Sequence, residues 1–487
     1  MNPGVEAVDA PDATDHPSRR FLILLGAVVA VAVAVRWAFI LLVDPVIPDL
    51  GDASAYRMLA EGIADGRGYV RPYDFAATGA LFRTAEYPPL FPFLLSLAHR
   101  AGLDTIDQQR MFMALFGSGT VAVIGLVGRR VGGARVGLVA AGIAAVYPML
   151  FQADAALMPE TLAALGAAVV VLFALRLWDH PGVGNAAGLG LATGLTILTR
   201  AEAALLLPLV VGAFVLLRRG GPAPSRRLVL AGVAVACAVG VVAPWTIRNA
   251  LVFHELVPVS NNLGSVTRGS NCDLAYQGDF RGMWVTSVDP KASVDPEGRC
   301  FGGFVVDDRQ NEAESAAVLR RDGLDYIGDH RDEVPAIMAV RWARTFGLYR
   351  PSQQTAFESL EGRSITWERF GTRVFYVLAL VAVAGAVVLG RRRPAHLWPL
   401  LATVVAVSVT TMITYGNQRF RAGAEPAFVV LAAVAVLAVV DRVRARRTAD
   451  RQDEPVADGT EPSGSDADTG DPPESDRVES ESATAVN

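Results

Sequence analysis

The stretch from Asp49 to Pro92 gathers ionisable side chains directly after a long apolar run. A carboxylate beside a developing nucleophile can serve as a general base for a hydroxyl or an amine, and the planar fork of arginine suits phosphate oxygens. If the apolar run crosses a bilayer, this loop sets both kinds of group at one membrane face, where they suit chemistry on a charged, lipid-linked substrate. The groups concerned are Asp49, Asp52, Glu61, Asp65, Arg83 and Glu86.

The composition excludes an ordinary soluble enzyme. Of 487 residues, 52% are apolar and 19% are charged, and the mean hydropathy is +0.34. This balance is typical of a polytopic membrane protein. The net charge of -5 averages over segments on opposite sides of a membrane, so it identifies no partner.

Ten apolar runs predict the elements that must position the charged loop. The first, 21–43, supplies about the ~20 residues that a spanning helix needs, and no A-x-A-type site follows it, which favours an uncleaved span over a signal peptide. The expected fold is an all-α polytopic membrane protein of about 10 spans, with a range of 9–13. The other runs are 110–128, 136–152, 159–178, 186–199, 203–217, 228–247, 372–390, 396–414 and 424–440, of which 186–199 and 203–217 are short.

The arginine distribution predicts the orientation of these spans. With the N-terminus in the cytoplasm, every arginine cluster beside a span falls on the inner side, as the positive-inside rule requires. Residues 1–20 are then expected to be a disordered cytoplasmic lead, and 441–487 a disordered, acidic cytoplasmic tail. The inner clusters are Arg129, Arg130 and Arg135; Arg176; Arg218, Arg219, Arg226 and Arg227; Arg391, Arg392 and Arg393; and Arg442, Arg444, Arg446 and Arg447.

Two large segments fall on the outer side, the first loop at 44–109 and a lobe at 248–371. Cys272 and Cys300 both lie in the lobe, where a disulfide is plausible in an oxidising compartment and two unpaired thiols are the alternative. Residues 333–349 have apolar side chains at helical spacing, as expected of a helix lying on the interface. The lobe either covers the active site and reads the acceptor or merely packs against the first loop.

Several arginines break the positive-inside pattern. Ionisable groups held at the outer ends of spans are costly and usually functional, so the set is expected to bind a phosphate or pyrophosphate leaving group. The alternative for each one is an arginine that anchors a helix end by reaching the interface. The set comprises Arg83, Arg200, Arg248, Arg268, Arg419 and Arg421.

Carboxylates form a second set at the same face. One could act as the general base, and two or three together could hold a divalent metal through oxygen ligands. No histidine motif supports a zinc site, since His99 and His254 are isolated, and Glu61 and Asp65 are four apart on the expected solvated face of a helix. The set comprises Asp49, Asp52, Glu86, Asp154, Glu160, Glu202 and Glu425.

The chain resembles the GT-C superfamily of integral membrane glycosyltransferases, the group that contains protein O-mannosyltransferases and the lipid A aminoarabinose transferase. The resemblance runs from about residue 21 to residue 440 and is carried by short motifs in a fixed order. These are Gly51-Asp52-Ala53-Ser54-Ala55-Tyr56, Glu86-Tyr87-Pro88-Pro89-Leu90, Met158-Pro159-Glu160, Leu198-Thr199-Arg200-Ala201-Glu202, Pro244-Trp245-Thr246-Ile247-Arg248-Asn249 and Tyr415-Gly416-Asn417-Gln418-Arg419-Phe420-Arg421.

This resemblance implies a bundle with interfacial helices in the first outer loop, a polyprenyl-phosphate sugar donor, and transfer with inversion. Asp52 best matches the family's first-loop aspartate, with Asp49 second, and Glu86 precedes the paired prolines. No cofactor is certain. A divalent metal is possible, but Gly51-Asp52 replaces the double acidic pair of the best-known members, which puts metal dependence in doubt. The implied phosphate-binding residues are Arg83, Arg200, Arg248, Arg419 and Arg421.

Other classes stay open. An oligosaccharide ligase or polymerase using diphosphate-linked donors would share the arginines, whereas a lipid-linked sugar transporter should place its charges in mid-span. A membrane scaffold would leave the one-sided charges without purpose, and no glycine-rich phosphate loop on a βαβ unit supports a soluble nucleotide-sugar enzyme. Expected partners are the bilayer, the lipid-linked donor and a lipid, glycan or protein acceptor, with no nucleic acid. The sequence specifies neither the sugar nor the acceptor.

Overall fold

The computed structural model describes residues 17–43, 47, 49, 51–218, 220–285, 300–301 and 311–452. Most of the two expected disordered ends, 1–16 and 453–487, lies outside the described residues. The chain divides into two compact units, 1–440 and 441–487, and the first unit contains the membrane bundle, the first outer loop and the lobe. Helices dominate the described residues, in which the only β interaction given is one isolated antiparallel bridge between Val70 and Arg83.

Seven described helices are long and apolar enough to cross a membrane. A bent pair of helices, angled by 51°, makes an eighth if it is one span. The helices are α1 (Arg19–Val43), α5 (Ile106–Gly132), α8 (Glu160–Asp179), α11 (Pro224–Phe253), α17 (Ile365–Arg392), α18 (Pro394–Ile413) and α19 (Glu425–Gln452), and the bent pair is α6 (Ala134–Val146) with α7 (Pro148–Ala155).

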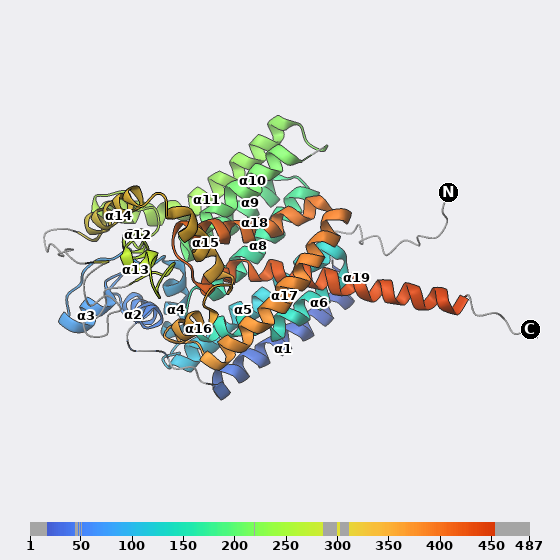
Figure 1. Ribbon diagram of the computed structural model, residues 1–487, viewed down its shortest axis with the longest axis horizontal. Coiled ribbons are helices and arrows are strands. Elements are labelled where there is room, and N and C mark those ends of the chain that lie inside the picture. The colour runs from blue at the N-terminus through green and yellow to red at the C-terminus, as the bar shows by residue number, and fades with distance from the viewer. Residues whose placement is uncertain are drawn as a thin grey trace, which may run out of the picture. The chain divides into compact units, whose positions relative to one another are not determined.

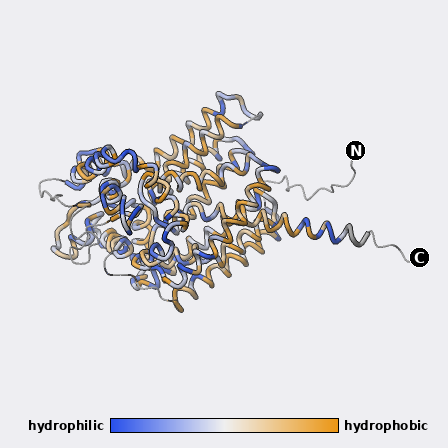
Figure 2. The backbone as a smooth tube through the Cα atoms, viewed as in Figure 1, coloured by the Kyte–Doolittle hydropathy of each residue, from blue (hydrophilic) through white to orange (hydrophobic). Residues whose placement is uncertain are grey.

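Two runs that the sequence marked as short are also apolar helices here: α9 (Val183–Thr199), and the 3-10 turn η1 (Ala201–Leu205) continued by α10 (Leu206–Leu217). The expectation of an all-α multi-pass membrane protein is confirmed. The total of about ten spans stays a prediction, because only seven or eight described segments meet the length and hydropathy requirement. Figure 2 shows hydrophobic residues along the bundle and more hydrophilic ones on the loops at one end.

Small residues let the helices approach closely. A Cβ atom added at Gly137 of α6 would lie 2.4 Å from the carbonyl oxygen of Gly125 in α5, and one added at Gly190 of α9 would lie 2.1 Å from that of Ala234 in α11. Backbone contact of this kind replaces the hydrophobic driving force that is missing between helices in lipid. The glycine- and alanine-rich runs therefore set the helix spacing.

One charged pair lies within the bundle. Arg36 of α1 is fully buried, and its Nε lies 2.6 Å from Oδ2 of Asp154 in α7. Arg36 also donates to the carbonyl oxygens of Ala32 and Ala145. Asp154 serves as the counter-ion of Arg36. A buried charge without a partner is very costly, and the pairing offsets that cost.

The first outer loop contains three short helices, α2 (Asp52–Ala64), α3 (Pro72–Thr78) and α4 (Leu90–Arg100). Aromatic contacts join α2 to the start of α4: the ring of Tyr56 lies 4.7 Å from that of Tyr87 and 5.1 Å from that of Phe91, between centroids. Figure 1 shows this loop and the lobe together at one end of the bundle. The packed aromatic rings hold the start of α2, and with it Asp52, in a defined place.

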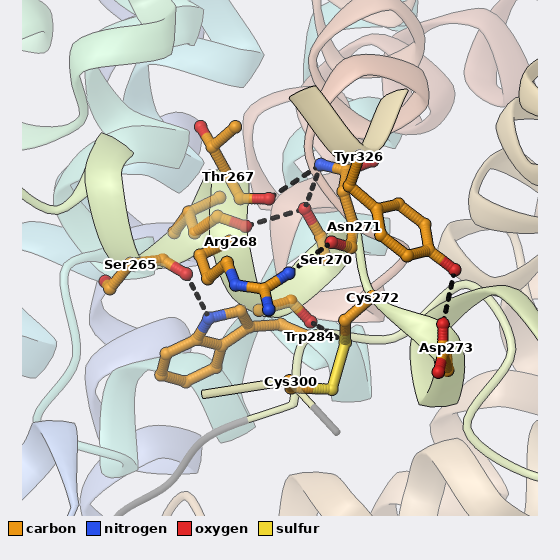
Figure 3. Close-up of a disulfide and its surroundings, with 12 residues drawn as sticks. Ser265, Thr267, Arg268, Ser270, Asn271, Cys272, Asp273, Trp284, Cys300 and Tyr326 are labelled. Carbon is orange, nitrogen blue, oxygen red and sulfur yellow. Dashed lines mark hydrogen bonds between the residues drawn. A yellow bond between two sulfur atoms is a disulfide. The ribbon is translucent and has the colours of Figure 1, made fainter. Parts of the chain in front are cut away.

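The lobe is built from α12 (Leu263–Ser270), α13 (Asp273–Tyr276), α14 (Glu312–Asp329), α15 (Val334–Thr345) and α16 (Pro351–Ser359). A disulfide joins Cys272 to Cys300, with their Cα atoms 5.0 Å apart (Figure 3). Beside it, the indole nitrogen of Trp284 donates to the Ser265 carbonyl, and the Tyr326 hydroxyl donates to Asp273 (Figure 3). The disulfide thus closes a hydrogen-bonded lobe.

The expectation that a helix at 333–349 lies on the interface is wrong for two of its side chains. Arg341 and Arg344 of α15 are buried and do not face the interface. Arg341 donates to the carbonyl oxygen of Ser270 and to the side-chain oxygen of Asn271. Arg344 donates to the carbonyl oxygen of Arg281. Their guanidinium groups therefore fasten α15 to the rest of the lobe.

Candidate functional site

A cavity of about 800 Å³ opens between the loop at 44–109, the lobe and the adjacent ends of the spans. Its charged residues come from four segments that are distant in sequence. Most of the remaining wall is apolar, and α11 is its largest contributor. A smaller cavity of about 50 Å³ shares Arg200, Glu202 and Arg419 with it. The charged residues of the large cavity are Asp52, Glu160, Arg200, Glu202 and Arg419.

Asp52 is the first residue of α2. It follows Gly51, whose φ of 139° lies in a region that disfavours side chains. The Oδ1 atom of Asp52 accepts from the Tyr87 hydroxyl at 3.1 Å, and Oδ2 pairs with Nη1 of Arg419 at 3.0 Å. The side chain is 27% exposed. Asp52 is therefore held at the N-terminus of α2 by Tyr87 and Arg419, and it stays accessible from the cavity.

Arg200 lies at the break between α9 and η1, in extended backbone conformation. Its Nη1 lies 2.7 Å from Oε1 of Glu160, the first residue of α8, and its Nε lies 2.5 Å from Oε1 of Glu202. The guanidinium also covers the ring of Phe420, 4.7 Å from the centroid. Both carboxylates orient this arginine toward the cavity.

Arg419 lies in the 3-10 turn η2 (Gln418–Gly423), which begins after Asn417. The Asn417 side chain accepts from the backbone nitrogen of Arg419, and Nη2 of Arg419 donates to the Tyr415 hydroxyl at 3.2 Å. Its Nε, 3.9 Å from Oε1 of Glu160, has no hydrogen-bond partner in the described part of the chain, and neither has Oε2 of Glu160. These buried polar atoms are available to a ligand.

Glu361, which no sequence pattern selected, also faces Arg419. Its Oε2 lies 3.4 Å from Nη1 of Arg419, and its side chain is 14% exposed. Burial, only partly offset by Arg419, raises the pKa of Glu361 to about 8. The only sequence signal was an acidic residue before Gly362, whose φ is 80°, in the short connection between α16 and α17.

Glu86 lies in the first loop but does not line either cavity. The charge that acts on it most strongly is that of Glu312 of α14, which accepts from the backbone nitrogen of Ala85 at 2.8 Å and pairs with Arg71 at 3.1 Å. Part of the Glu86 side chain is open to solvent. The surrounding protein nevertheless desolvates its carboxyl group and, with the Glu312 and Asp52 carboxylates, raises its pKa to about 7.

Other expected site residues are placed away from both cavities. Asp49 is exposed, and Arg83 is exposed beside the bridge to Val70. Arg248 of α11 donates to the carbonyl oxygens of Thr84 and Tyr69, so it ties the end of a span to the first loop.

Arg421 and Glu425, which were also expected in the site, instead form an ion pair with each other. Nε of Arg421 lies 2.6 Å from Oε1 of Glu425, whose other oxygen accepts from the Tyr147 hydroxyl at 2.8 Å. Arg421 is fully buried, with its guanidinium 3.5 Å from the ring centroid of Phe375. Arg268 donates to the Asn271 carbonyl within the lobe. None of these residues lines either cavity.

The described residues contain no group of three or more His, Cys, Asp or Glu side chains that could hold a metal ion. The carboxylates at and beside the cavity face arginines: Arg419 lies within ion-pair distance of Asp52 and Glu361, and Arg200 of Glu160. A guanidinium occupies the place between carboxylates that a cation would need. These described residues therefore do not fit the divalent metal that the resemblance left possible.

Residues 86–247 match the family model described as dolichyl-phosphate-mannose-protein mannosyltransferase. No curated protein matches this sequence. ArnT from Cupriavidus metallidurans bound to undecaprenyl phosphate aligns at 17% identity over 86% of this chain and 78% of that one, but with a TM-score of 0.40, which is too low to support an argument about the fold.

Two solved structures of the oligosaccharyltransferase from Archaeoglobus fulgidus are more similar. The apo form aligns with a TM-score of 0.51 at 14% identity, over 89% of this chain and 52% of that one. The form in complex with an inhibitory peptide and a dolichol-phosphate, named AglB, has the same TM-score and identity over 90% and 52%. This chain thus spans about half the length of AglB. The resemblance expected from the motifs is confirmed: the protein is similar in fold to the GT-C glycosyltransferases, and a third of its sequence matches their mannosyltransferase family.

Proposed function

We propose that this protein is a membrane glycosyltransferase that transfers a sugar from a polyprenyl-phosphate donor to an acceptor at the extracytoplasmic face, with inversion at the anomeric carbon. In this proposal, residues 21–440 form the glycosyltransferase domain, both termini are cytoplasmic, and the protein lies in the plasma (inner) membrane. The family description supports a lipid-phosphate sugar donor. The dolichol-phosphate in the AglB complex supports a lipid-phosphate partner for this fold.

The observation that carries the proposal is the composition of the large cavity. Two arginines and three carboxylates lie together in its wall. The rest of the wall is largely apolar and includes Val239, Val242 and Ile247 of α11. An amphiphile with an anionic head and a long hydrocarbon tail matches both parts. A water-soluble nucleotide sugar would leave the apolar wall without a partner.

The chemistry follows from the charged groups. The donor's phosphate leaves as an ionised group, so it needs no general acid, and Arg200 and Arg419 stabilise the charge that grows on it. Asp52 takes the proton of the acceptor hydroxyl or amine as the new glycosidic bond forms and the bond to phosphate breaks. Attack from the face opposite the phosphate gives inversion.

Asp52 and Arg419 hold one another at 3.0 Å. A donor phosphate that takes over Arg419 would release the Asp52 carboxylate from this ion pair and leave it free to accept the proton of the acceptor. In this scheme, donor binding activates the base. The site would then avoid presenting a free base before the donor is in place.

The test is transfer of labelled sugar from polyprenyl-phosphate donors in vesicles that contain the purified protein. Loss of transfer in Asp52→Asn, with donor still bound, is the expected result. An oligosaccharide ligase is the second candidate, because AglB is an oligosaccharyltransferase of the same fold. Transfer only from diphosphate-linked oligosaccharides would establish that candidate, and movement of lipid-linked sugar without bond formation would favour a transporter.

A further inference from the structure

Arg419 faces more carboxylate groups than it can bind. Its Nη1 lies 3.0 Å from Oδ2 of Asp52 and 3.4 Å from Oε2 of Glu361, and its Nε lies 3.9 Å from Oε1 of Glu160. Only the contact with Asp52 is a hydrogen bond. The Oε2 atom of Glu361 is buried and has no hydrogen-bond partner in the part of the chain that the structure describes.

If all the ionisable groups of the site are charged, its carboxylates outnumber its guanidinium groups and repel an anionic ligand. Arg200 is paired with Glu160 and Glu202, while Arg419 is shared between Asp52 and Glu361. Four carboxylates thus face two guanidinium groups, and a phosphodiester would add a further negative charge. Like charges within a few ångströms of one another cannot all stay ionised at low cost, so at least one of these carboxylates must hold a proton when the anion binds.

Glu361 is the carboxylate best suited to hold that proton. Asp52 has a hydrogen bond from Tyr87 and one from Arg419, and Glu160 has one from Arg200. Glu361 has only the long contact to a guanidinium group that is already bonded to Asp52. Its charged neighbours are Arg419 of η2, Asp52 of α2, Glu160 of α8 and Glu358 of α16, so three of the four repel an ionised form.

The backbone fixes Glu361 in this position. The next residue, Gly362, has a φ of 80°, and a Cβ atom there would touch the Ala156 carbonyl oxygen at 3.4 Å. The turn therefore packs directly against the chain that precedes α8. The close approach of this turn to Ala156 holds the backbone of Glu361 beside Arg419.

We propose that Glu361 is a positioning residue of this site, and that its neutral form frees Arg419 to turn from the carboxylates to the phosphate of a bound polyprenyl phosphodiester. This inference rests on the proposed function. When Glu361 is ionised, it competes with the ligand for Arg419 and repels the phosphate. When Glu361 is protonated, Arg419 has one fewer anionic partner, and the carboxyl group contributes no charge.

The proposal predicts how ligand binding depends on pH. Burial raises the pKa of Glu361 to about 8, so the competent, protonated form predominates below that pH and is lost above it. Affinity should be constant from pH 6 to pH 7 and then fall by about tenfold between pH 7 and pH 9, the slope expected for one linked proton. A phosphodiester keeps its single negative charge over this range, so the ligand itself does not titrate.

The experiment measures binding of the methyl diester of undecaprenyl phosphate to the full-length protein in nanodiscs from pH 6 to pH 9. Glu361→Gln, a permanently neutral residue of similar shape, should bind at pH 9 as wild type binds at pH 6. Glu86→Gln and Glu61→Gln are the controls and should keep the wild-type pH dependence, because neither side chain contacts Arg419. Glu86 is the essential control, since its own pKa is raised to about 7.

The outcomes separate this inference from the proposed function. Failure of wild type to bind the diester at any pH overturns the proposed function, and this inference with it. Binding of wild type without pH dependence leaves the proposed function intact and overturns the role of Glu361, whether or not the variant folds. The same role is overturned if Glu361→Gln keeps the wild-type dependence or if Glu86→Gln abolishes it.

Discussion

Arg419 and Asp52 are separated by 367 positions in the chain and form an ion pair at 3.0 Å. One belongs to the turn before the last span, and the other begins the first helix after the first span. The pair joins the N-terminal and C-terminal parts of the bundle's sequence at the cavity. The group proposed as the base and a group proposed to bind the leaving phosphate are thus held in contact before any ligand arrives.

Asp52→Asn should abolish transfer, whereas Asp49→Asn should leave it nearly unchanged. Asparagine can keep the hydrogen bond from Tyr87 but cannot accept the proton of the acceptor, and removal of a general base lowers the rate by about 10²- to 10⁴-fold. Asp49 is exposed and lies outside the cavity lining. Vesicle transfer assays at saturating donor check both variants. A strong defect in Asp49→Asn with normal Asp52→Asn would reverse the assignment.

Arg200→Gln and Arg421→Gln should fail for different reasons, although both arginines were expected to bind phosphate. Arg200 lines the cavity, so its loss should weaken donor binding by about ten- to a hundredfold, as for a lost charge-assisted hydrogen bond. Arg421 is buried against Glu425, and breaking that pair should destabilise the fold by about 3–5 kcal/mol.

Donor titration and thermal unfolding together distinguish the two variants. Arg200→Gln should raise KM for the donor even at low temperature, where the variant is folded, although it also loses its pair with the buried Glu160. Arg421→Gln should unfold early and bind donor normally at low temperature. A normal unfolding temperature with a raised KM in Arg421→Gln would place Arg421 in the site.

Gly416→Ala should destabilise the segment that carries Arg419. A Cβ atom at position 416 would lie 2.4 Å from the Arg341 carbonyl oxygen in α15, so either the lobe or the segment must move. Overpacking of this kind costs about 1–3 kcal/mol. The matched control is Gly142→Ala in α6, where an added Cβ meets nothing within 4 Å and alanine favours the helix. Equal unfolding temperatures for the two variants would disprove the close contact.

Cys272→Ser should loosen the lobe, and Cys237→Ser should not. The Cys272–Cys300 disulfide closes a loop of 28 positions, and removing a bridge of this size typically costs about 2–4 kcal/mol. Hydrogen exchange of 263–285 and a mobility shift on reducing gels check the prediction. Cys237 is free and lies in α11. Unchanged exchange in Cys272→Ser would show that the hydrogen bonds alone hold the lobe.

The attachment of the first loop to α14 should weaken as pH rises from about 4.5 to about 7. Glu86 has an ordinary pKa of 4.5, and the native environment raises it to about 7, so between these values the native state binds more protons than the unfolded state and its stability falls with pH. Glu86→Gln should remove this slope. Hydrogen exchange of 312–329 against pH measures it, with Glu61→Gln as the control. A slope that persists in Glu86→Gln would point to Glu312 instead.

Hydropathy and arginine placement were sufficient to predict the membrane class and to bring out Asp52, Glu160, Arg200, Glu202 and Arg419 as charged residues at span ends. These signals are local, because a span needs a continuous apolar run and arginine bias acts on the adjacent loops. The same signals selected Asp154, Arg248, Arg421 and Glu425 equally strongly. The structure places all four outside the cavity, where they have partners of their own.

The sequence by itself determined that the chain is a multi-pass membrane protein and predicted a set of carboxylates and arginines at the ends of its spans, because hydropathy, helix length and charge bias depend on neighbouring residues. Only the tertiary structure decided which charges meet. The partner of Arg419 is Asp52 and not a nearby acid, Arg36 neutralises Asp154, and Glu361 enters the site through the turn at Gly362. Such pairs depend on how distant helices pack, and burial then fixes them because an unpaired charge away from water is costly.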